Sequence, residues 1–564
     1  MKVLIVGGVA GGATAAARIR RLDEQAEIVV FERSGFVSYA NCGLPYYIGD
    51  VITDPEELTL QTPESFFSRF RVIMKVRHEV TAIHPDRKTV SVKNLNTGEE
   101  FEENYDKLIL SPGAKPTQPR LPGVGLDKLF TLRTVEDTFR IKDYINKNNP
   151  KSAVLAGGGF ISLELAENLR ELGMDVTIVQ RPKQLLATFD ADMAAFVHAK
   201  LRKHGVTLRL GETVEGFREE NGGVSALLKD KAPLHADMVV LAIGVTPDTP
   251  LAAQAGLAQG IKGSIVKDEC MRTSIPDIYA VGDAVEVENF VTKNRALISL
   301  AGPANKQGRI AADNICGGES RYGGSQGSSV VKIFDMTAAS TGINEKTAKA
   351  AGIDCDYVVL SPAAHATYYP GARTMTMKVL FEKETYRLLG AQIVGYEGVD
   401  KRIDVIATAI HFGADALELA KLDLAYAPPY SSAKDPVNMA GFMIENIATG
   451  KVKQFYVDDV AALPRDGSVT LVDARTPGEY ARGHAEGFVN IPVDNLRERM
   501  DEIPAGKSVY VFCQSGLRSY VACRILTQLG YECYNFAGGY GFYSTVTKDR
   551  LAAEESWPCG MEKL

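Results

Sequence analysis

The chain of 564 residues is poor in cysteine, has no long apolar run and carries no excess of positive charge. Its eight cysteines are too sparse for a disulfide scaffold, so we expect free thiols in a reducing compartment. No apolar run approaches the ~20 residues that a membrane helix needs. Lys and Arg number 63 against 70 Asp and Glu, which argues against non-specific binding of nucleic acid. We therefore predict a soluble cytoplasmic protein with no membrane or nucleic-acid partner.

Histidine is also scarce, with eight residues in no paired spacing, and the cysteines show no metal-ligand spacing. We therefore predict no metal site. Glycine, by contrast, is abundant at 52 residues, which suits many turns between strands and helices. At ~150 residues per domain, the length predicts roughly four domains.

The first thirty residues predict a strand, a glycine turn, a helix and a second strand. The strands are expected at 3–6 and 28–31, with a helix over 13–22 between them. Glu32 ends the second strand, where a carboxylate accepts a hydrogen bond from the ribose of a bound dinucleotide. The turn brings the backbone close to a pyrophosphate through four glycines: Gly7, Gly8, Gly11 and Gly12. A signal peptide is the alternative for this stretch, but the βαβ pattern accounts for more of it.

A second unit of this kind begins near residue 153. A strand over 153–156 leads into Gly157 and Gly159, a helix over 161–169 follows, and a strand over 176–179 completes the unit. The position of the acid holds Gln180, and Arg181 follows it. Arg181 tolerates a 2′-phosphate and Gln180 still binds a ribose hydroxyl, so both NADPH and NADH stay open.

A third segment, residues 273–283, reads as a strand that ends in Gly282 and Asp283. An acid just beyond a buried strand can hold the polyol chain of a cofactor. The alternative is an ordinary helix N-cap. Two preceding dinucleotide units favour the first interpretation.

Cys42 follows the first dinucleotide unit in a polar turn. A dithiol flavoenzyme would have a second cysteine at position 37 or 47, but these positions hold Val37 and Tyr47. Cys42 must therefore pair with a sulfur or a peroxide oxygen that a substrate brings. An unreactive buried cysteine is the alternative.

Cys513 ends an apolar strand over 509–512, and a short loop then opens a helix through 521–529. Backbone N–H groups converge on a sulfur in such a loop, and the helix dipole and Arg518 favour its thiolate. The alternative is a core cysteine at a strand end. Cys523, on the helix that follows, is expected in the core, and Cys559 in a frayed tail.

Two sets of motifs resemble known families. Residues 1 to about 445 resemble the pyridine-nucleotide-disulfide oxidoreductases, and within them the coenzyme A-disulfide reductases with a single redox cysteine. Residues 460–564 resemble a rhodanese domain, and fusions of the two are described as NAD(P)H-dependent coenzyme A persulfide or polysulfide reductases. The motifs are GGVAGGATAAARIRRL, SYANCGLPY, AGGGFISLELAENL, TSIPDIYAVGDA, LAGPANKQGR, YYPGA, LAYAPPYSSAKDPVNM, LVDARTPGEYARGHAEGFVNIPV and FCQSGLRS.

The resemblance implies an α/β fold with two Rossmann-like domains, an α+β dimerisation domain and a C-terminal α/β rhodanese domain. The FAD-binding domain is expected at 1–112 with 245–324, and the NAD(P)H-binding domain at 113–244. Dimerisation and rhodanese domains are expected at 325–450 and 460–564, and residues 450–464 read as a linker and lead-in.

The resemblance also implies roles for individual residues. Cys42 is the redox-active nucleophile that forms a mixed disulfide with coenzyme A, and Cys513 carries a persulfide. Tyr368 and Tyr426 reach Cys42 from the partner subunit of a homodimer, and Arg518 acts beside Cys513. Asp473 and Arg475 hold the rhodanese fold together. Coenzyme A is bound by Arg18, Arg21, Ser38 and Asn41, with Arg71, Asn305 and Lys434 as further candidates. Arg33 and Gly113 join the residues named above in binding the cofactors FAD and NADH or NADPH.

The implied activity is NAD(P)H-dependent reduction of coenzyme A disulfide, coenzyme A persulfide or polysulfide. Gln514 stands where many rhodaneses have Arg, which bears on the choice of sulfur donor. A peroxidase or oxidase of the same fold is one alternative, although Ala10 replaces the His that those relatives carry. A sulfur carrier or redox sensor with a structural flavin is the other.

Overall fold

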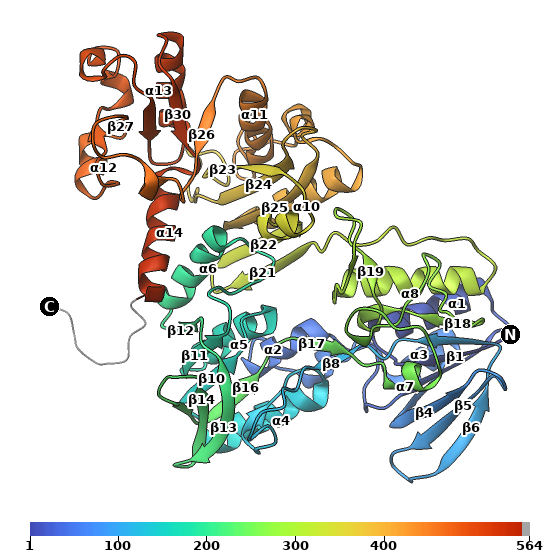
Figure 1. The fold of residues 1–564 in the computed structure, drawn as a ribbon. Coiled ribbons are helices and arrows are strands. Elements are labelled where there is room, and N and C mark those ends of the chain that lie inside the picture. The colour runs from blue at the N-terminus through green and yellow to red at the C-terminus, as the bar shows by residue number, and fades with distance from the viewer. Residues whose placement is uncertain (555–564) are drawn as a thin grey trace. The chain divides into compact units, whose positions relative to one another are not determined.

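The computed structural model describes residues 1–554 and divides into two compact units (Figure 1). The first unit contains residues 1–183 and 205–327, and the second contains residues 184–204 and the chain from 328 onward. Cys559 lies outside the described residues. None of the helices in residues 1–554 combines the length and apolar character that crossing a bilayer requires.

The first unit opens with a parallel five-stranded sheet in the order β18-β7-β1-β2-β3. Its central strands are near-continuous apolar runs, as expected for strands buried on both faces. The expected strand–helix–strand unit is confirmed, and α1 packs against α8. The elements are β1 (Lys2–Val6), α1 (Ala10–Leu22), β2 (Glu27–Glu32), α2 (Leu44–Ile48), α3 (Pro63–Phe70), β3 (Ile73–Val76), β7 (Lys107–Leu110), α7 (Pro250–Gln254), β18 (Ile278–Ala280) and α8 (Ala301–Ile315).

A second parallel sheet, in the order β12-β11-β10-β16-β9, confirms the other expected unit. A short antiparallel pair, β8 with β17, joins the two parts at residues 114–116 and 245–247, next to the predicted domain boundaries. The elements are β8 (Ala114–Pro116), β9 (Leu129–Phe130), α4 (Val135–Asn148), β10 (Ser152–Ala156), α5 (Phe160–Glu171), β11 (Asp175–Gln180), β12 (Thr207–Leu210), β16 (Met238–Leu241) and β17 (Val245–Pro247).

Three-stranded antiparallel sheets accompany each parallel sheet of the first unit. One consists of β4 (His78–His84), β5 (Thr89–Asn94) and β6 (Glu100–Asn104). The other consists of β13 (Val214–Glu220), β14 (Gly223–Leu228) and β15 (Leu234–Ala236), and its apolar side joins the core of the second parallel sheet.

The second unit begins with an antiparallel five-stranded sheet in the order β21-β22-β25-β24-β23. The sequence of this part predicts strands over 374–381 and 388–394 and a helix over about 401–412, and the structure has strands and a helix at these places. The elements are β21 (Ser329–Ile333), β22 (Met336–Gly342), α9 (Glu345–Ala350), β23 (Cys355–Leu360), β24 (Thr376–Glu382), β25 (Leu388–Gly395), α10 (Val399–His411) and α11 (Pro436–Ala448).

The C-terminal sheet is parallel, in the order β26-β30-β29-β27-β28. Its elements are β26 (Lys453–Phe455), β27 (Thr470–Asp473), α12 (Pro477–Ala481), β28 (Val489–Asn490), β29 (Val509–Phe512), α13 (Leu517–Gln528), β30 (Cys533–Phe536) and α14 (Gly539–Glu554). Strand β26 lies within the segment that we predicted to be a linker, and this part of the prediction is wrong. The strand is too short to show a pattern, but Phe455 is buried against the rings of Phe512 and Phe536.

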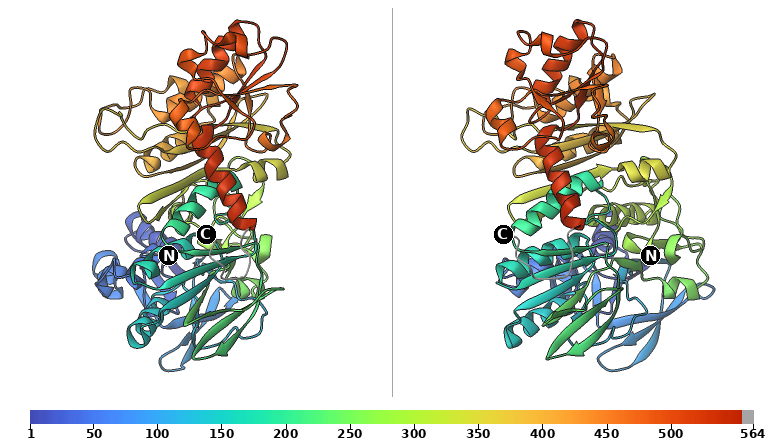
Figure 2. Two further views of the ribbon diagram at one scale, coloured as in Figure 1. Left: turned by 90° about the vertical axis from the view of Figure 1, so that its left-hand side faces the viewer. Right: turned by 60° about the vertical axis from the view of Figure 1, so that its left-hand side comes forward.

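Helix α6 (Ala191–Lys203) follows β11 in the chain but belongs to the second unit. It lies side by side with α14 in the views of Figures 1 and 2. The ring Nδ1 of buried His198 lies 2.8 Å from the Asp549 carboxylate, and Arg202 pairs with the same carboxylate. Nothing in the sequence pattern predicts this pairing, because the two helices are some 350 positions apart.

Candidate active sites

The turn between β1 and α1 leaves no room for side chains. Gly7 has a φ of 96°, and a Cβ there would lie 2.1 Å from the Ser111 carbonyl oxygen at the end of β7. A Cβ at Gly12 would lie 1.9 Å from the Gly7 carbonyl oxygen. Only glycine fits both positions, and the turn forms the close backbone surface that a pyrophosphate needs.

The Glu32 carboxylate closes this turn from the side of β2. It accepts hydrogen bonds from the backbone N–H groups of Gly8 and Ser34, at 2.8 and 2.9 Å. Burial raises the pKa of Glu32. Each carboxylate oxygen keeps a lone pair for a further donor, so Glu32 can still accept from a ribose hydroxyl.

Asp283 lies within a short 3₁₀ turn, Gly282–Ala284, directly after β18. Its carboxylate pairs with Arg133 at 2.8 Å and makes no cap to a helix N–H, so the N-cap alternative does not describe it. Gly113 lies beside the same arginine and has a φ of 70°. Arg33 is exposed and pairs with Asp248 at 2.6 Å. These residues and the glycine turn stay predicted contacts of the cofactor, and their arrangement is compatible with a bound dinucleotide.

The second glycine turn repeats the geometry of the first. Gly157 has a φ of 122°, and a Cβ there would lie 2.1 Å from the Ala242 carbonyl oxygen. Gly159 caps α5 and borders open space. Gln180 ends β11 half-buried and Arg181 is exposed beside it, and both stay predicted contacts of the nicotinamide nucleotide.

Cys42 lies in the short 3₁₀ turn Asn41–Gly43, just before α2. Its thiol is exposed and has no disulfide partner among residues 1–554. Partial burial raises the pKa of Cys42, and the Glu164 carboxylate raises it further. The surroundings of Cys42 thus favour its thiol form over the thiolate.

Glu164 is a functional candidate that our sequence analysis missed. It lies on α5, which packs against α2, and burial together with Glu167 raises its pKa to about 7. The signal available in the sequence was a carboxylate between Leu163 and Leu165, on the helix that follows the second glycine turn. A carboxyl group that titrates near neutrality beside a thiol can exchange a proton with it.

The predicted coenzyme A residues of the first unit fall into two groups. Arg18 of α1 pairs with Asp313 of α8 at 2.7 Å, while Arg21 is exposed. Asn305 of α8 accepts a hydrogen bond from Thr14 of α1, so tertiary packing brings Arg18 and Asn305 to one helix pair. The other group lies outside this helix pair and consists of Ser38, Asn41 and Arg71. The buried Asn41 side-chain oxygen has no hydrogen-bond partner in the described residues.

Tyr368 and Tyr426 belong to the second unit, as does Lys434. The two phenol oxygens lie 2.5 Å apart, and the residues are 74% and 45% exposed. Tyr368 and Tyr426 lie on two separate loops, and buried Arg402 holds these loops together. It donates hydrogen bonds to the carbonyl oxygens of Ala364 in one loop and Tyr430 in the other. The pair is thus a rigid polar feature on the surface of this subunit.

The loop after β29 holds Cys513 in a ring of donors. The Gly516 N–H and the Ser519 hydroxyl donate to Sγ at 3.1 and 3.2 Å, and Gly516 has a φ of 97°. Arg518 forms a two-point ion pair with Glu479, with both bonds at 2.7 Å, and this pair lowers the pKa of Glu479 to about 2. The structure thus shows one backbone N–H at the sulfur rather than the expected convergence of several, and the charge of Arg518 is already partnered. Cys513 is fully buried in the core of the domain, as the alternative expects. Cys523 lies in the core, as predicted.

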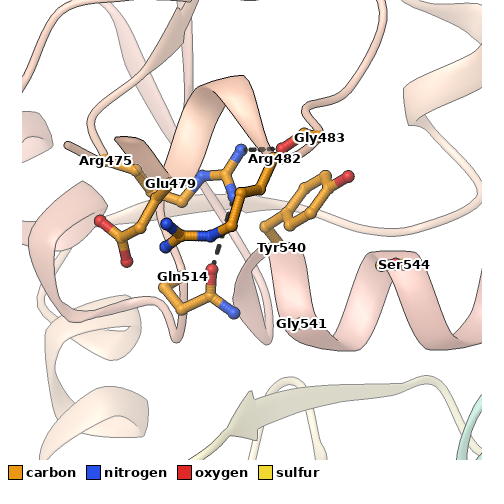
Figure 3. A pocket seen from close by; sticks show the side chains of 8 residues that line it. All are labelled: Arg475, Glu479, Arg482, Gly483, Gln514, Tyr540, Gly541 and Ser544. Atoms are coloured by element: carbon orange, nitrogen blue, oxygen red, sulfur yellow. Dashed lines mark hydrogen bonds between the residues drawn. The ribbon is translucent and has the colours of Figure 1, made fainter. Parts of the chain in front are cut away.

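A cavity of about 310 Å³ opens beside this loop (Figure 3). Arg475 forms one wall, where it stacks over the Tyr540 ring at 3.9 Å and donates toward the Gln514 side-chain oxygen. Arg475 also forms a buried ion pair with Asp473 at 2.7 Å, consistent with the predicted structural role of both residues. Exposed Arg482 also lines the cavity, as does Glu479, whose charge is paired with Arg518. With this carboxylate already partnered, the two arginines suit the cavity to a small anion.

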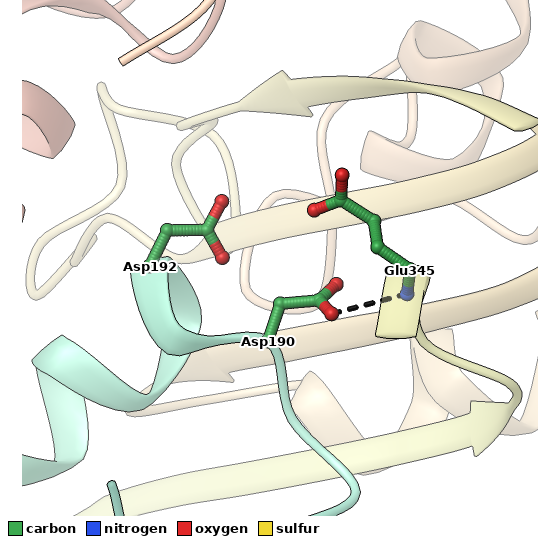
Figure 4. Close-up of side chains that lie close together, drawn as sticks. All are labelled: Asp190, Asp192 and Glu345. Atoms are coloured by element: carbon green, nitrogen blue, oxygen red, sulfur yellow. Dashed lines mark hydrogen bonds between the residues drawn. The ribbon is translucent and has the colours of Figure 1, made fainter. Parts of the chain in front are cut away.

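Three carboxylates, Asp190, Asp192 and Glu345, converge in the second unit (Figure 4). The ammonium group of Lys378 lies among them, 3.2 Å from Asp190 and 2.7 Å from Asp192, and it also pairs with Glu345. The buried ammonium group of Lys378 therefore occupies the place where a metal ion would bind these carboxylates, and the cluster does not support a metal site.

Family models match nearly the whole chain. The model described as pyridine nucleotide-disulphide oxidoreductase matches residues 1–308, its dimerisation domain matches residues 328–436, and a rhodanese-like domain matches residues 456–544. The chain belongs to the pyridine nucleotide-disulphide oxidoreductase family. This flavoprotein is thus an oxidoreductase with a C-terminal rhodanese domain, and FAD and NAD(P)H are the cofactors of its family.

Proteins similar to this flavoprotein include one that covers 78% of the chain and two that cover nearly all of it. Coenzyme A disulfide reductase of Staphylococcus aureus is 38% identical over 442 residues, which cover 78% of this chain and 99% of that protein. The structure of reduced Bacillus anthracis CoADR-RHD is 47% identical with a TM-score of 0.95, covering 97% of this chain and 98% of that one. A NAD-dependent persulfide reductase from A. fulgidus is 38% identical with a TM-score of 0.91, covering 96% and 100%.

Proposed function

We propose that this flavoprotein uses NAD(P)H to reduce coenzyme A disulfide or coenzyme A persulfide at Cys42. The observation that carries the proposal is an exposed, unpaired Cys42 thiol in the turn that follows the FAD-type glycine cradle. A thiol with no resolving cysteine must complete its redox cycle with a sulfur that the substrate supplies. The names and coverage of the relatives support coenzyme A as the carrier of that sulfur.

The proposed reaction begins when the sulfur of Cys42 attacks one sulfur of the substrate disulfide. The new bond joins Cys42 to coenzyme A, and the other half leaves as a thiol, or as sulfide from a persulfide. FAD, when bound, supplies the two electrons from NAD(P)H that break this mixed disulfide. The Glu164 carboxylate raises the pKa of Cys42 and so favours the protonated thiol before the attack.

The leaving sulfur needs a proton donor, and a tyrosine hydroxyl is a suitable one. We assign this role to Tyr368 and Tyr426 of the partner subunit in a homodimer, supported by the dimerisation domain and by the exposure of both phenols. Coenzyme A would lie along α1 and α8, with its phosphates near Arg18 and Arg21.

Cys513 would accept sulfane sulfur from polysulfide and hold it as a persulfide. Two donors to Sγ stabilise the anionic form, and the neighbouring cavity with Arg475 and Arg482 favours an anionic donor. The thiol of coenzyme A would then attack the outer sulfur of this persulfide, which forms coenzyme A persulfide and releases the Cys513 thiol, and coenzyme A persulfide would be the substrate of Cys42.

Replacing Cys42 tests the central step. Cys42→Ser is expected to lower NAD(P)H-dependent reduction of coenzyme A disulfide by about a thousandfold or more, because the nucleophile is lost. The absorbance of bound flavin should stay unchanged. Cys270→Ser is the matched control, since Cys270 is a partly exposed thiol outside the turn. Full turnover of Cys42→Ser would refute the proposal.

Cys513→Ser separates the two sulfur sites. We expect this variant to reduce coenzyme A disulfide and preformed coenzyme A persulfide at the wild-type rate, and to lose about tenfold or more with polysulfide. The measurement is NADH and NADPH oxidation with each acceptor, including peroxide. Equal losses with all sulfur acceptors would contradict the separate roles of Cys42 in reduction and Cys513 in sulfur transfer. Rapid turnover with peroxide alone would indicate a peroxidase.

A further inference from the structure

A pair of thiols lies inside the rhodanese domain, and neither of the two reactions proposed above uses it. Cys523 on α13 and Cys533 at the start of β30 bring their Sγ atoms to 3.0 Å, with the Cys533 thiol donating to Cys523. The two residues are 2% and 5% exposed, and both belong to the hydrophobic cluster that also contains Cys513. Both are free thiols in the structure.

The Sγ atoms of Cys523 and Cys533 need to move only a short distance to form a disulfide bond. A disulfide joins its sulfurs at about 2.05 Å, so closure brings the two atoms together by roughly one ångström. Cys523 and Cys533 are joined through the surface turn 529–532, where Leu529 is exposed and Gly530 has a φ of 89°. Cys533 is the first residue of β30 and is buried, so an oxidant reaches it only when this turn opens locally.

The same helix connects the pair to the Cys513 loop. Ser519, whose hydroxyl donates to the Cys513 Sγ, precedes Cys523 by four positions, so both lie on one face of α13. A bond from Cys523 to Cys533 therefore fixes the helix that supplies donors to the reactive sulfur.

We propose that Cys523 and Cys533 form a second redox site, a dithiol that polysulfides or low-molecular-weight disulfides oxidise to an internal disulfide. The Cys533 sulfur attacks one sulfur of the oxidant, and the first thiolate leaves. The Cys523 sulfur then attacks Cys533, and the second half of the oxidant leaves. Two electrons pass from the pair to the oxidant, whose two halves take up the two thiol protons. A low-molecular-weight disulfide leaves as two thiols, and a polysulfide leaves as sulfide or shorter polysulfide.

Burial sets the pace of this reaction. It raises the pKa of Cys523, and the neighbouring Cys533 raises it further, so Cys523 stays protonated until the turn opens. The exposed Cys42 thiol therefore reacts first, and the internal disulfide forms under a sustained excess of oxidant.

Peptide mapping of the whole wild-type holoenzyme tests the proposal without NAD(P)H, so reductase turnover does not enter. The reduced protein is incubated with excess hydroxyethyl disulfide, and in parallel with sodium polysulfide, then alkylated and digested with trypsin. We expect residues 519–524 and 525–548 to appear as one linked species, two hydrogens lighter than the sum of the free peptides. Dithiothreitol should separate them.

Two outcomes overturn the proposal. One is full alkylation of Cys523 and Cys533 after treatment that has already modified Cys42. The other is a link between residues 508–518, which carry Cys513, and residues 519–524. Cys270→Ser is the matched control and should keep the link, whereas Cys533→Ala should lose it. As a second measurement, oxidation should raise the rhodanese unfolding temperature by about 3 °C or more, because the bond restrains the unfolded chain, and no rise should occur in Cys533→Ala.

Discussion

At the scale of single residues, the charges around Cys42 decide how readily its thiol ionises. Burial and the Glu164 carboxylate both raise the pKa of Cys42, while Arg133 lowers it. Glu164 itself has a pKa of about 7, so it becomes charged in the same range in which the enzyme would work. Ionisation of Glu164 therefore opposes ionisation of Cys42 as the pH rises.

Glu164→Gln is expected to lower the pKa of Cys42, because the variant removes a negative charge that disfavours the thiolate. Alkylation of Cys42 by iodoacetamide at pH 8, above the pKa of Glu164, should become about threefold faster, and the effect should fade below pH 6. Glu171→Gln, an exposed position on the same helix, is the control. An unchanged or slower reaction at pH 8 would contradict this account.

At the scale of elements, most strands and helices follow from local pattern, and the exceptions are the short ones. The apolar run before Cys513 predicted β29, and the glycine turns predicted α1 and α5. Three-residue β26 has no such pattern, and it becomes a strand only because β30 offers it hydrogen bonds. Its stability comes from the side chain of Phe455 among aromatic rings.

Phe455→Ala is expected to destabilise the rhodanese domain by about 3–5 kcal/mol, since it removes a buried ring and leaves a cavity. The check is the unfolding transition of this domain in the full chain, followed in urea. Lys453→Ala on the same strand removes an exposed ion pair with Glu532 and a cation–π contact with Tyr534, and it should cost less than about 1 kcal/mol. Equal effects of the two substitutions would rule out β26 as a packed edge strand.

At the scale of the whole molecule, the proposed reductase centre draws on two subunits. Cys42 lies in the first unit, and the Tyr368–Tyr426 pair lies on the surface of the second. An assembled dimer would therefore let one chain supply the thiol and its partner supply the phenols. The dimerisation domain that the family model matches provides the surface for such an assembly.

Subunit mixing tests this arrangement. Homodimers of Cys42→Ser, and of a double variant with Tyr368→Phe and Tyr426→Phe, should each lose about a hundredfold or more in disulfide reduction. Co-expression of the two should restore about a quarter of the wild-type rate, because half of the dimers hold one intact centre. If the phenols served their own subunit, the mixed sample would stay inactive.

The sequence alone determined the two dinucleotide folds, the unpaired state of Cys42 within its turn and the loop around Cys513. Each depends on residues close together in the chain, where periodicity and glycine positions act directly. Only the tertiary structure decided that Glu164 lies near Cys42, that Arg18 pairs with Asp313 and that Cys523 meets Cys533. These contacts join elements through packing, and a contact made by packing leaves no spacing rule in a single sequence.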